Sequence, residues 1–350
     1  MSEMVQFPTG FLWGAATASH QIEGAACNGG RSESVWDVFS HTDGKVAHGH
    51  TGDVACGHHH RVDDDVAMMA DLGLQSYRFS ISWSRVMLDG RGRINQEGRL
   101  LPPPRRPTPR PRHRSVPTLF RWDLPQALEE LGGFRNRDTV SWFGDYAALM
   151  VRELGDRVHM WSTFNEPWCY AYLGHASGVH APGLTDPHAA VTVAHHELLA
   201  HGLALQTMRA ERNDLQLGIV INPSNIVSDA QRPADDAQVR LIDAIHNRWW
   251  FDATLRNNYP ADLLESYGRW PTPSGQVTPR RSASPSYDSA TTTPACHRST
   301  SPRTAAPTTT RSSTADAPTR VGSTTSTSTC ERSDTPSTRA STFAATTSGR

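Results

Sequence analysis

An abrupt change of composition at about residue 270 limits what this chain of 350 residues can fold into. All ten tryptophans and all eight methionines lie at or before Trp270. Beyond it, Ser, Thr, Pro, Ala and Arg supply 65 of 80 residues, and Leu, Ile, Met and Trp do not occur. Such a segment buries too little apolar surface to offset the entropy lost on ordering. We therefore predict a folded domain over residues 1–270 and a disordered tail over residues 271–350.

Up to residue 270, strand-like segments alternate with segments of helical periodicity. The predicted strands cover residues 11–19, 77–83, 116–122, 158–164 and 217–221, and the predicted helices cover 63–72, 138–155, 186–212 and 235–255. This alternation predicts an α/β fold with a parallel sheet. Polar and aromatic residues at the carboxyl ends of the strands favour a (β/α)8 TIM barrel, here incomplete with about five β/α units. A doubly wound sheet is the alternative, but no glycine-rich phosphate loop follows the first strand.

One interval interrupts the alternation. Residues 102–114 hold six prolines and five arginines in thirteen positions, where a helix should return the chain from the second strand to the third. Each interior proline costs a helix about 3 kcal/mol, so we predict no helix there. A polyproline ligand or a basic tract is the functional alternative.

Charge and hydropathy exclude several classes of function. The net charge is −1, and the arginines do not cluster beside aromatic residues as nucleic-acid binding requires. The amino terminus has no apolar core and no run approaches membrane-spanning length, so we predict a cytoplasmic protein with no membrane partner. The histidines at 58–60 precede three aspartates, but three adjacent histidines on a helix cannot all face one ion. We predict no metal and no cofactor.

Four stretches carry a resemblance to a known family. They are FLWGAATASHQIEG (11–24), YRFSISWSR (77–85), PTLFRWDLPQALEELGGF (117–134) and WSTFNEPW (161–168). Together they resemble glycoside hydrolase family 1, the β-glucosidase family, over residues 7 to 270 except the proline–arginine interval. The resemblance implies a retaining hydrolase that removes terminal β-D-glucosyl residues from β-glucosides or short β-linked oligosaccharides. Oligomeric state is left open.

The resemblance also implies roles for individual residues. Glu166 matches the acid/base, and Asn165 matches the residue that hydrogen-bonds the hydroxyl next to the reacting carbon. Gln21 and Trp122 match positions that bind the sugar hydroxyls and shape the pocket, although Trp122 also fits a core aromatic. Asn222 is similar to a contact near the leaving group, and a simple turn-forming asparagine is the alternative.

The chain departs from the family at two places that bear on catalysis. Arg121 stands where the family has a sugar-contacting histidine, and its larger, permanently charged side chain is expected to crowd or reorient the sugar. The family nucleophile is a glutamate in a Glu-Asn-Gly motif, and this tripeptide does not occur in the sequence. Retaining hydrolysis needs two carboxylates about 5–5.5 Å apart. We therefore expect this chain to be inactive, and a non-catalytic sugar-binding remnant or pseudogene product is the alternative.

One hypothesis joins the two anomalous segments. Out-of-frame reading of a G+C-rich gene yields mainly Pro, Arg, Ser, Thr and Ala, which are the residues that dominate both. We suppose that a shifted frame, later restored, wrote residues 99–115, and that a second shift wrote residues 271–350. An interaction protein that uses these segments is a further alternative, but no short motif repeats in the tail.

Overall fold

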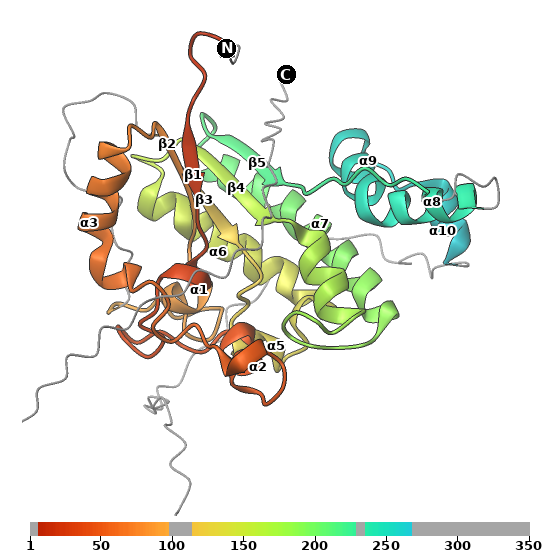
Figure 1. Ribbon diagram of the computed structural model, residues 1–350, viewed down its shortest axis with the longest axis horizontal. Coiled ribbons are helices and arrows are strands. Elements are labelled where there is room, and N and C mark those ends of the chain that lie inside the picture. Colours follow the sequence, from red (N-terminus) through yellow and green to blue (C-terminus); the bar gives the residue numbers. More distant parts are fainter. Residues whose placement is uncertain (1–5, 98–113, 229–234, 268–350) are drawn as a thin grey trace, which may run out of the picture. The chain divides into compact units, whose positions relative to one another are not determined.

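The computed structural model describes residues 6–97, 114–228 and 235–267 (Figure 1). The predicted disordered tail and most of the proline–arginine interval lie outside these described residues, so both remain predictions. Two residues assigned to that interval, Arg114 and Ser115, are described, and they begin a strand.

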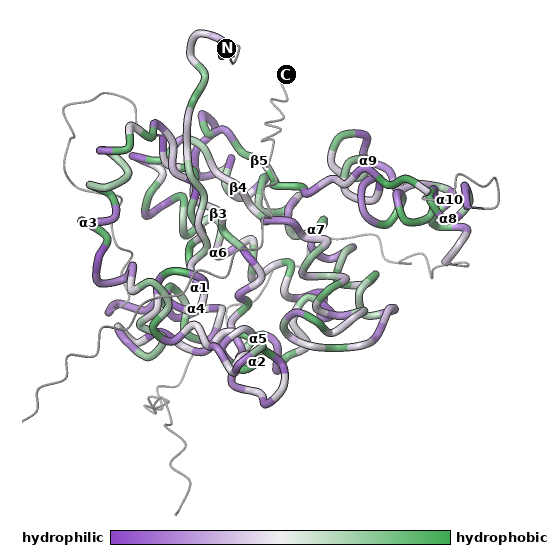
Figure 2. Tube along the Cα trace, viewed as in Figure 1, coloured by the Kyte–Doolittle hydropathy of each residue, from purple (hydrophilic) through white to green (hydrophobic). Residues whose placement is uncertain are grey.

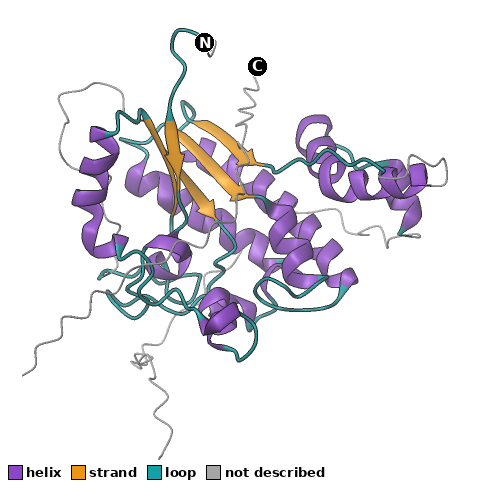
Figure 3. Cartoon of the chain, in the orientation of Figure 1, coloured by secondary structure: helices purple, strands orange, loops and turns teal. Residues whose placement is uncertain are grey.

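The described strands form one parallel sheet in which spatial order equals chain order (Figure 3). The strands are β1 (Gly14–Ala16), β2 (Ser76–Ser80), β3 (Arg114–Phe120), β4 (Met160–Asn165) and β5 (Gln216–Val220). The register aligns Phe120 with Phe164 and Asn165 with Val220, so the carboxyl ends of β3, β4 and β5 share one edge. Among the described strands β1 and β5 are each paired on one side only. The sheet is the open form that an incomplete (β/α)8 barrel takes, as the sequence predicts.

Helices connect and flank the strands. They are α1 (Ser19–Ile22), α2 (Val35–His41), α3 (His58–Asp71), α4 (Trp83–Val86), α5 (Gln126–Glu129), α6 (Asp138–Leu154), α7 (Pro187–Glu211), α8 (Asp236–Asp243), α9 (Trp249–Arg256) and α10 (Ala261–Ser266). Helix α3 lies in the connection from β1 to β2, α6 in that from β3 to β4, and α7 in that from β4 to β5. None of the described helices is long and apolar enough to cross a bilayer.

The longest helix, α7, begins where its sequence says it should. Asp186 is the N-cap, and its carboxylate accepts hydrogen bonds from the backbone N–H groups of His188 (2.9 Å) and Ala189 (3.2 Å). Pro187 occupies the first turn, where its missing N–H would have had no partner in the helix. On β4, the Thr163 hydroxyl and His201 Nδ1 of α7 are hydrogen-bonded at 2.8 Å, which ties the helix to the sheet.

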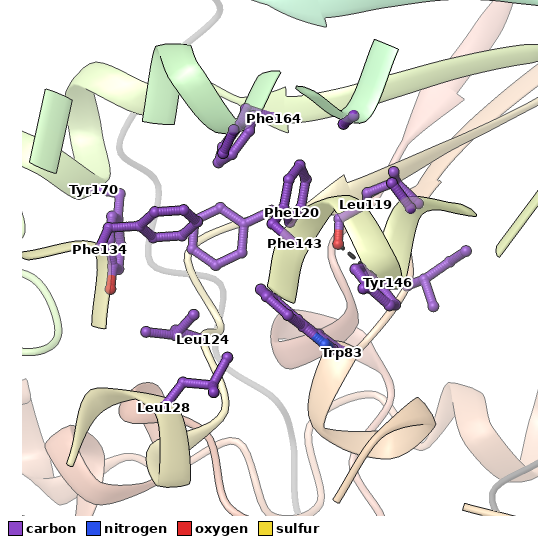
Figure 4. Packing of buried hydrophobic residues seen from close by; sticks show 14 of the residues in the cluster. Trp83, Leu119, Phe120, Leu124, Leu128, Phe134, Phe143, Tyr146, Phe164 and Tyr170 are labelled. Carbon is purple, nitrogen blue, oxygen red and sulfur yellow. Dashed lines mark hydrogen bonds between the residues drawn. The ribbon is translucent and has the colours of Figure 1, made fainter. Parts of the chain in front are cut away.

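An aromatic core lies between the sheet and helices α6 and α7 (Figure 4). Trp83 stacks on Tyr146 with ring centroids 4.8 Å apart, and Phe143 of α6 contacts Phe164 of β4 at 4.6 Å. The Tyr146 hydroxyl donates to the Leu119 carbonyl at 3.3 Å, so this buried phenol keeps a partner. The core fixes the positions at which β3 and β4 end.

Helix α3 contrasts with this core because none of its residues is buried. Figure 2 shows hydrophobic residues interspersed with hydrophilic ones along it. Met68 is 55% exposed, and Leu72, the residue that follows the helix, is 70% exposed, so apolar side chains here are only partly covered.

Several predicted boundaries are wrong. The predicted strand at 11–19 shrinks to β1, because α1 begins at Ser19. The predicted strand at 77–83 ends at Ser80, and the next residues turn into α4, where Trp83 is fully buried. The predicted helix at 235–255 is divided by a wider π-type turn over Ala244–Arg248. Helix α10 was not predicted.

Candidate active site

Glu166 follows β4 directly and has an unusual backbone. Its φ is +49°, in the left-handed region that a non-glycine residue adopts at a cost of about 1–3 kcal/mol. Its N–H donates to the Val220 carbonyl at the end of β5, with an N···O distance of 2.7 Å. A strained residue held by a neighbouring strand is typical of a functional position, because the surrounding structure must impose the conformation.

Trp122 supports Glu166 from the adjacent strand. It follows β3 by two residues, and its own φ is +70°. The indole N–H donates to the carbonyl of Asn165 at 2.8 Å and lies 3.3 Å from that of Glu166. The partly buried indole therefore connects the ends of β3 and β4. Because Trp122 also packs against the hydrophobic core, both its pocket role and the core-aromatic alternative remain predictions.

Asn165 is fully buried and is oriented by an arginine. Its Oδ1 accepts a hydrogen bond from Nη1 of Arg78 at 2.6 Å. Its Nδ2 is buried with no hydrogen-bond partner among the described residues. The amide thus has donors to offer a ligand, which fits the role that the resemblance implies for it.

Arg78 has no role in the sequence-based prediction, although it lies within one of the family-like stretches. Burial lowers the pKa of its guanidinium most, Arg121 lowers it further, and Glu166 opposes the shift. The available signal was a single charge inside the otherwise uncharged strand segment YRFSISW. A charge at such a position needs a polar partner in the fold.

A cavity of about 350 Å³ lies beside Trp122. It brings together Gln21, Arg121 and Trp122, with Trp36 and His180 also in its lining. Gln21 is exposed and comes from α1, whereas Arg121 and Trp122 follow β3. Glu166 is not among the lining residues and is connected to the cavity through Trp122.

Arg121 lies over the ring of Trp122, with its Cζ 4.7 Å from the ring centroid. Burial lowers the pKa of its guanidinium, and Glu166 and then Asp123 oppose that shift. Its Nε is buried without a hydrogen-bond partner among the described residues. Whether Arg121 crowds or reorients a sugar remains a prediction.

Asn222 reaches Glu166 through a cysteine. Its Nδ2 donates to Sγ of Cys169 at 3.5 Å, and that sulfur lies 3.8 Å from Oε2 of Glu166. Burial, followed by the nearby Glu166 carboxylate, raises the pKa of the Cys169 thiol to about 12. The thiol therefore keeps its proton near neutral pH and faces Glu166 as a weak donor. Cys169 was missed in the sequence, where nothing distinguishes it from an ordinary buried cysteine.

Two carboxylates next to lining residues of the cavity, Asp123 after Trp122 and Asp37 beside His20, are engaged in other contacts. Asp123 is fully buried and accepts a hydrogen bond from the Ser19 hydroxyl at 2.7 Å, and burial raises its pKa to about 7. Asp37 pairs with Arg31 at 2.7 Å. In the histidine-rich stretch, His58 pairs with Asp65 at 2.6 Å. Within the described residues no group of three or more His, Cys, Asp or Glu is arranged to hold a metal ion.

Comparison with known proteins adds an independent finding. The family model described as glycosyl hydrolase family 1 matches residues 3–290. Beta-glucosidase A of Acetivibrio thermocellus is 42% identical over 266 residues, which are 75% of this chain and 59% of that protein. Thermostable beta-glucosidase B of Thermobispora bispora is 46% identical over 266 residues, which are 75% of this chain and 54% of that protein.

Solved structures agree with these matches. The family 1 β-glucosidase of Thermotoga maritima superimposes with a TM-score of 0.69 at 39% identity, covering 74% of this chain and 59% of that one. The psychrophilic β-glucosidase of Micrococcus antarcticus gives 0.70 at 44% identity, covering 75% and 56%. This chain therefore spans less than two thirds of the length of these relatives.

Proposed function

This chain belongs to glycosyl hydrolase family 1, and from that premise we propose that residues 1–270 are the acid/base-bearing part of a retaining β-glucosidase. Residues 271–350 lie outside this catalytic part in our proposal, although the family match runs to residue 290. The substrates are β-glucosides or short β-linked oligosaccharides, as the names of the relatives suggest.

The observation that carries the proposal is the constrained position of Glu166. Its left-handed backbone, the hydrogen bond from its N–H to Val220 and the indole of Trp122 together fix where its carboxyl group starts. A general acid must be held within hydrogen-bond reach of the leaving-group oxygen, so a fixed backbone supports that role. Asn165 lies beside it, and its buried Nδ2 has no hydrogen-bond partner among the described residues.

We propose further that this chain lacks the second carboxylate. No Glu-Asn-Gly tripeptide occurs in its 350 residues. Asp37 and Asp123, the carboxylates described above near the cavity, are held by Arg31 and Ser19. General acid help alone is worth about 10²–10⁴-fold. Enzymes of this kind need accelerations of roughly 10⁶-fold and far more, so Glu166 alone is insufficient.

Turnover of an aryl β-glucoside tests this. The purified chain should hydrolyse it no faster than its Glu166→Gln variant, which keeps the size of the side chain and removes its acidity. As a positive control, the segment after Trp270 is replaced by the corresponding segment of the Thermobispora relative, and Arg121→His is introduced. This chimera should hydrolyse the glucoside with retention of configuration. Turnover by the original chain that Glu166→Gln abolishes would show that another carboxylate serves as nucleophile.

A non-catalytic sugar-binding protein is the second candidate, and the cavity favours it. Gln21 and Trp122 line the cavity whether or not a nucleophile is present, and Asn165, although outside the lining, lies next to Glu166 with an Nδ2 that has no partner among the described residues. Binding of a sugar that is lost in Asn165→Ala, together with no turnover, distinguishes this function from that of an enzyme.

A further inference from the structure

We propose that the cavity beside Trp122 selects a sugar bearing an anionic substituent, a carboxylate or a phosphate, over a neutral glucoside. The inference rests on the proposed function, because it concerns the ligand of the same cavity. It rests on the positive charge that Arg121 brings to the cavity wall and on the charged groups around that arginine.

The first observation is a guanidinium in the wall that forms no ion pair with a described carboxylate, although the charges of Glu166 and Asp123 act on it. Arg121 lines the cavity, and Trp122 covers one face of its guanidinium at 4.7 Å. Its Nε has no hydrogen-bond partner among the described residues. The ion pairs found in the described part of the chain use other arginines, such as Arg31 and Arg85. Arg121 therefore has both charge and donors to offer a ligand.

The second observation is that another guanidinium lies close by. Arg78 is near enough to Arg121 for the two charges to repel, which adds to the effect of burial in lowering the pKa of Arg78. Glu166 is the carboxylate whose charge favours both guanidinium groups. Two guanidinium groups thus share this one carboxylate, so a ligand that brings its own negative charge adds to the compensation.

The third observation is that nothing in the lining repels an anion. No aspartate or glutamate is among the described residues that line the cavity. The histidines His20 and His180 have pKa values lowered chiefly by burial, so they are neutral at pH 7 and available as hydrogen-bond donors. Asp37, which lies 3.7 Å from His20, is already paired with Arg31.

The hydrogen-bonding geometry of arginine explains why an anionic sugar should bind more tightly than a neutral one. A guanidinium presents parallel N–H donors that match the two oxygens of a carboxylate or phosphate, and such charge-assisted bonds are about twice as strong as neutral ones. A sugar hydroxyl offers neither that geometry nor a charge. The difference should exceed about tenfold in dissociation constant, which is the effect of a single such bond.

Isothermal titration calorimetry tests this preference: each sugar is added to the full chain at pH 7 and low salt, and its dissociation constant is measured. The probes are glucose, glucuronate and glucose 6-phosphate, and the last two separate a carboxylate from a phosphate source. At least one anionic sugar should bind about tenfold or more tightly than glucose. In Arg121→Gln, and independently in Arg121→His, that preference should disappear while glucose binding persists.

Arg91→Gln is the matched control. The Cζ of Arg91 lies 4.8 Å from the ring centroid of Trp142, so this variant removes the same charge and the same kind of ring contact from an exposed site. It should keep the full preference, and near-ultraviolet circular dichroism should show that all three variants retain the fold.

The outcomes separate the two proposals. If glucose binds as tightly as both anionic sugars, or if Arg121→Gln keeps the preference, this inference is wrong while the proposed function stands. Inorganic phosphate that binds as tightly as glucose 6-phosphate also overturns it, because the sugar then contributes nothing. If no sugar binds at all, the sugar-binding function and this inference both fail.

Discussion

At the scale of single residues, the site is made of polar groups that the fold buries and then only partly satisfies. Asn165 Nδ2, Arg121 Nε and Asn222 Oδ1 are all buried without hydrogen-bond partners among the described residues. Other buried side-chain atoms of the described residues, such as Trp83 Nε1 and Glu197 Oε1, also lack partners, so it is the position of these three atoms near Glu166, and not their number, that suggests a polar ligand. They are also the atoms at which ligand binding should recover the free energy lost on desolvation.

Asp123 gives a prediction about pH. Burial raises its pKa from 3.8 to about 7 in the folded chain. Between these two pH values the Asp123 carboxyl group is ionised in the unfolded chain and still protonated in the folded chain. The free energy of unfolding should therefore fall as pH rises from about 4 to 7. Above pH 7 both states are ionised, and the loss levels off at up to roughly 4 kcal/mol.

Asp123→Asn tests this prediction, because the amide keeps an oxygen for the Ser19 hydroxyl and cannot ionise. Urea unfolding at pH 5 and pH 8 should show that the variant loses less stability between the two values than the parent chain. An equal loss in both chains would assign the pH dependence to other groups.

At the scale of elements, α7 could be predicted almost to the residue, and β1 could not. The boundaries of α7 are set by local chemistry, an aspartate cap and a proline in the first turn, and both are visible in the sequence. At β1 the strand-like aromatics Phe11 and Trp13 pack on each other, with ring centroids 4.9 Å apart, and stay largely exposed instead of extending the strand.

The site divides in the same way. The predicted site residues Glu166, Asn165 and Trp122 each belong to a contiguous family-like stretch. Arg78 and Cys169 were missed as participants because their roles depend on partners: Arg78 is separated from Asn165 by 87 positions, and Cys169 from Asn222 by 53. A spacing of that length leaves no periodic signal, so only the packing of strands against one another reveals the contact.

The cap of α7 gives a prediction at this scale. Asp186→Ala should lower the free energy of unfolding by about 1 kcal/mol, because two backbone N–H groups lose their acceptor. Asp186→Asn should cost much less, since asparagine also caps helices well. Urea denaturation of both variants measures the difference, and equal losses would mean that the charge of Asp186 matters more than its hydrogen bonds.

At the scale of the whole molecule, the described sheet has two unpaired edges, at β1 and β5. Edges of this kind offer free N–H and C=O groups to another chain. Met68 of α3 and Leu72, which follows that helix, add exposed apolar surface that a closed barrel would cover with neighbouring helices.

We therefore expect the purified chain to self-associate. Light scattering across a concentration series should show a mass that grows with concentration. A chain that stays monomeric at high concentration would contradict this expectation, and would mean that the edges are covered.

The backbone of Glu166 also bears on how the sequence changes over time. Glycine adopts a positive φ without the steric cost that glutamate meets at +49°, so replacing Glu166 by glycine would relieve strain. In a chain that had no use for a carboxylate here, random substitution would replace the glutamate by residues that tolerate this conformation. We infer that a glutamate is kept at this position for its proposed acid/base chemistry, at the expense of stability.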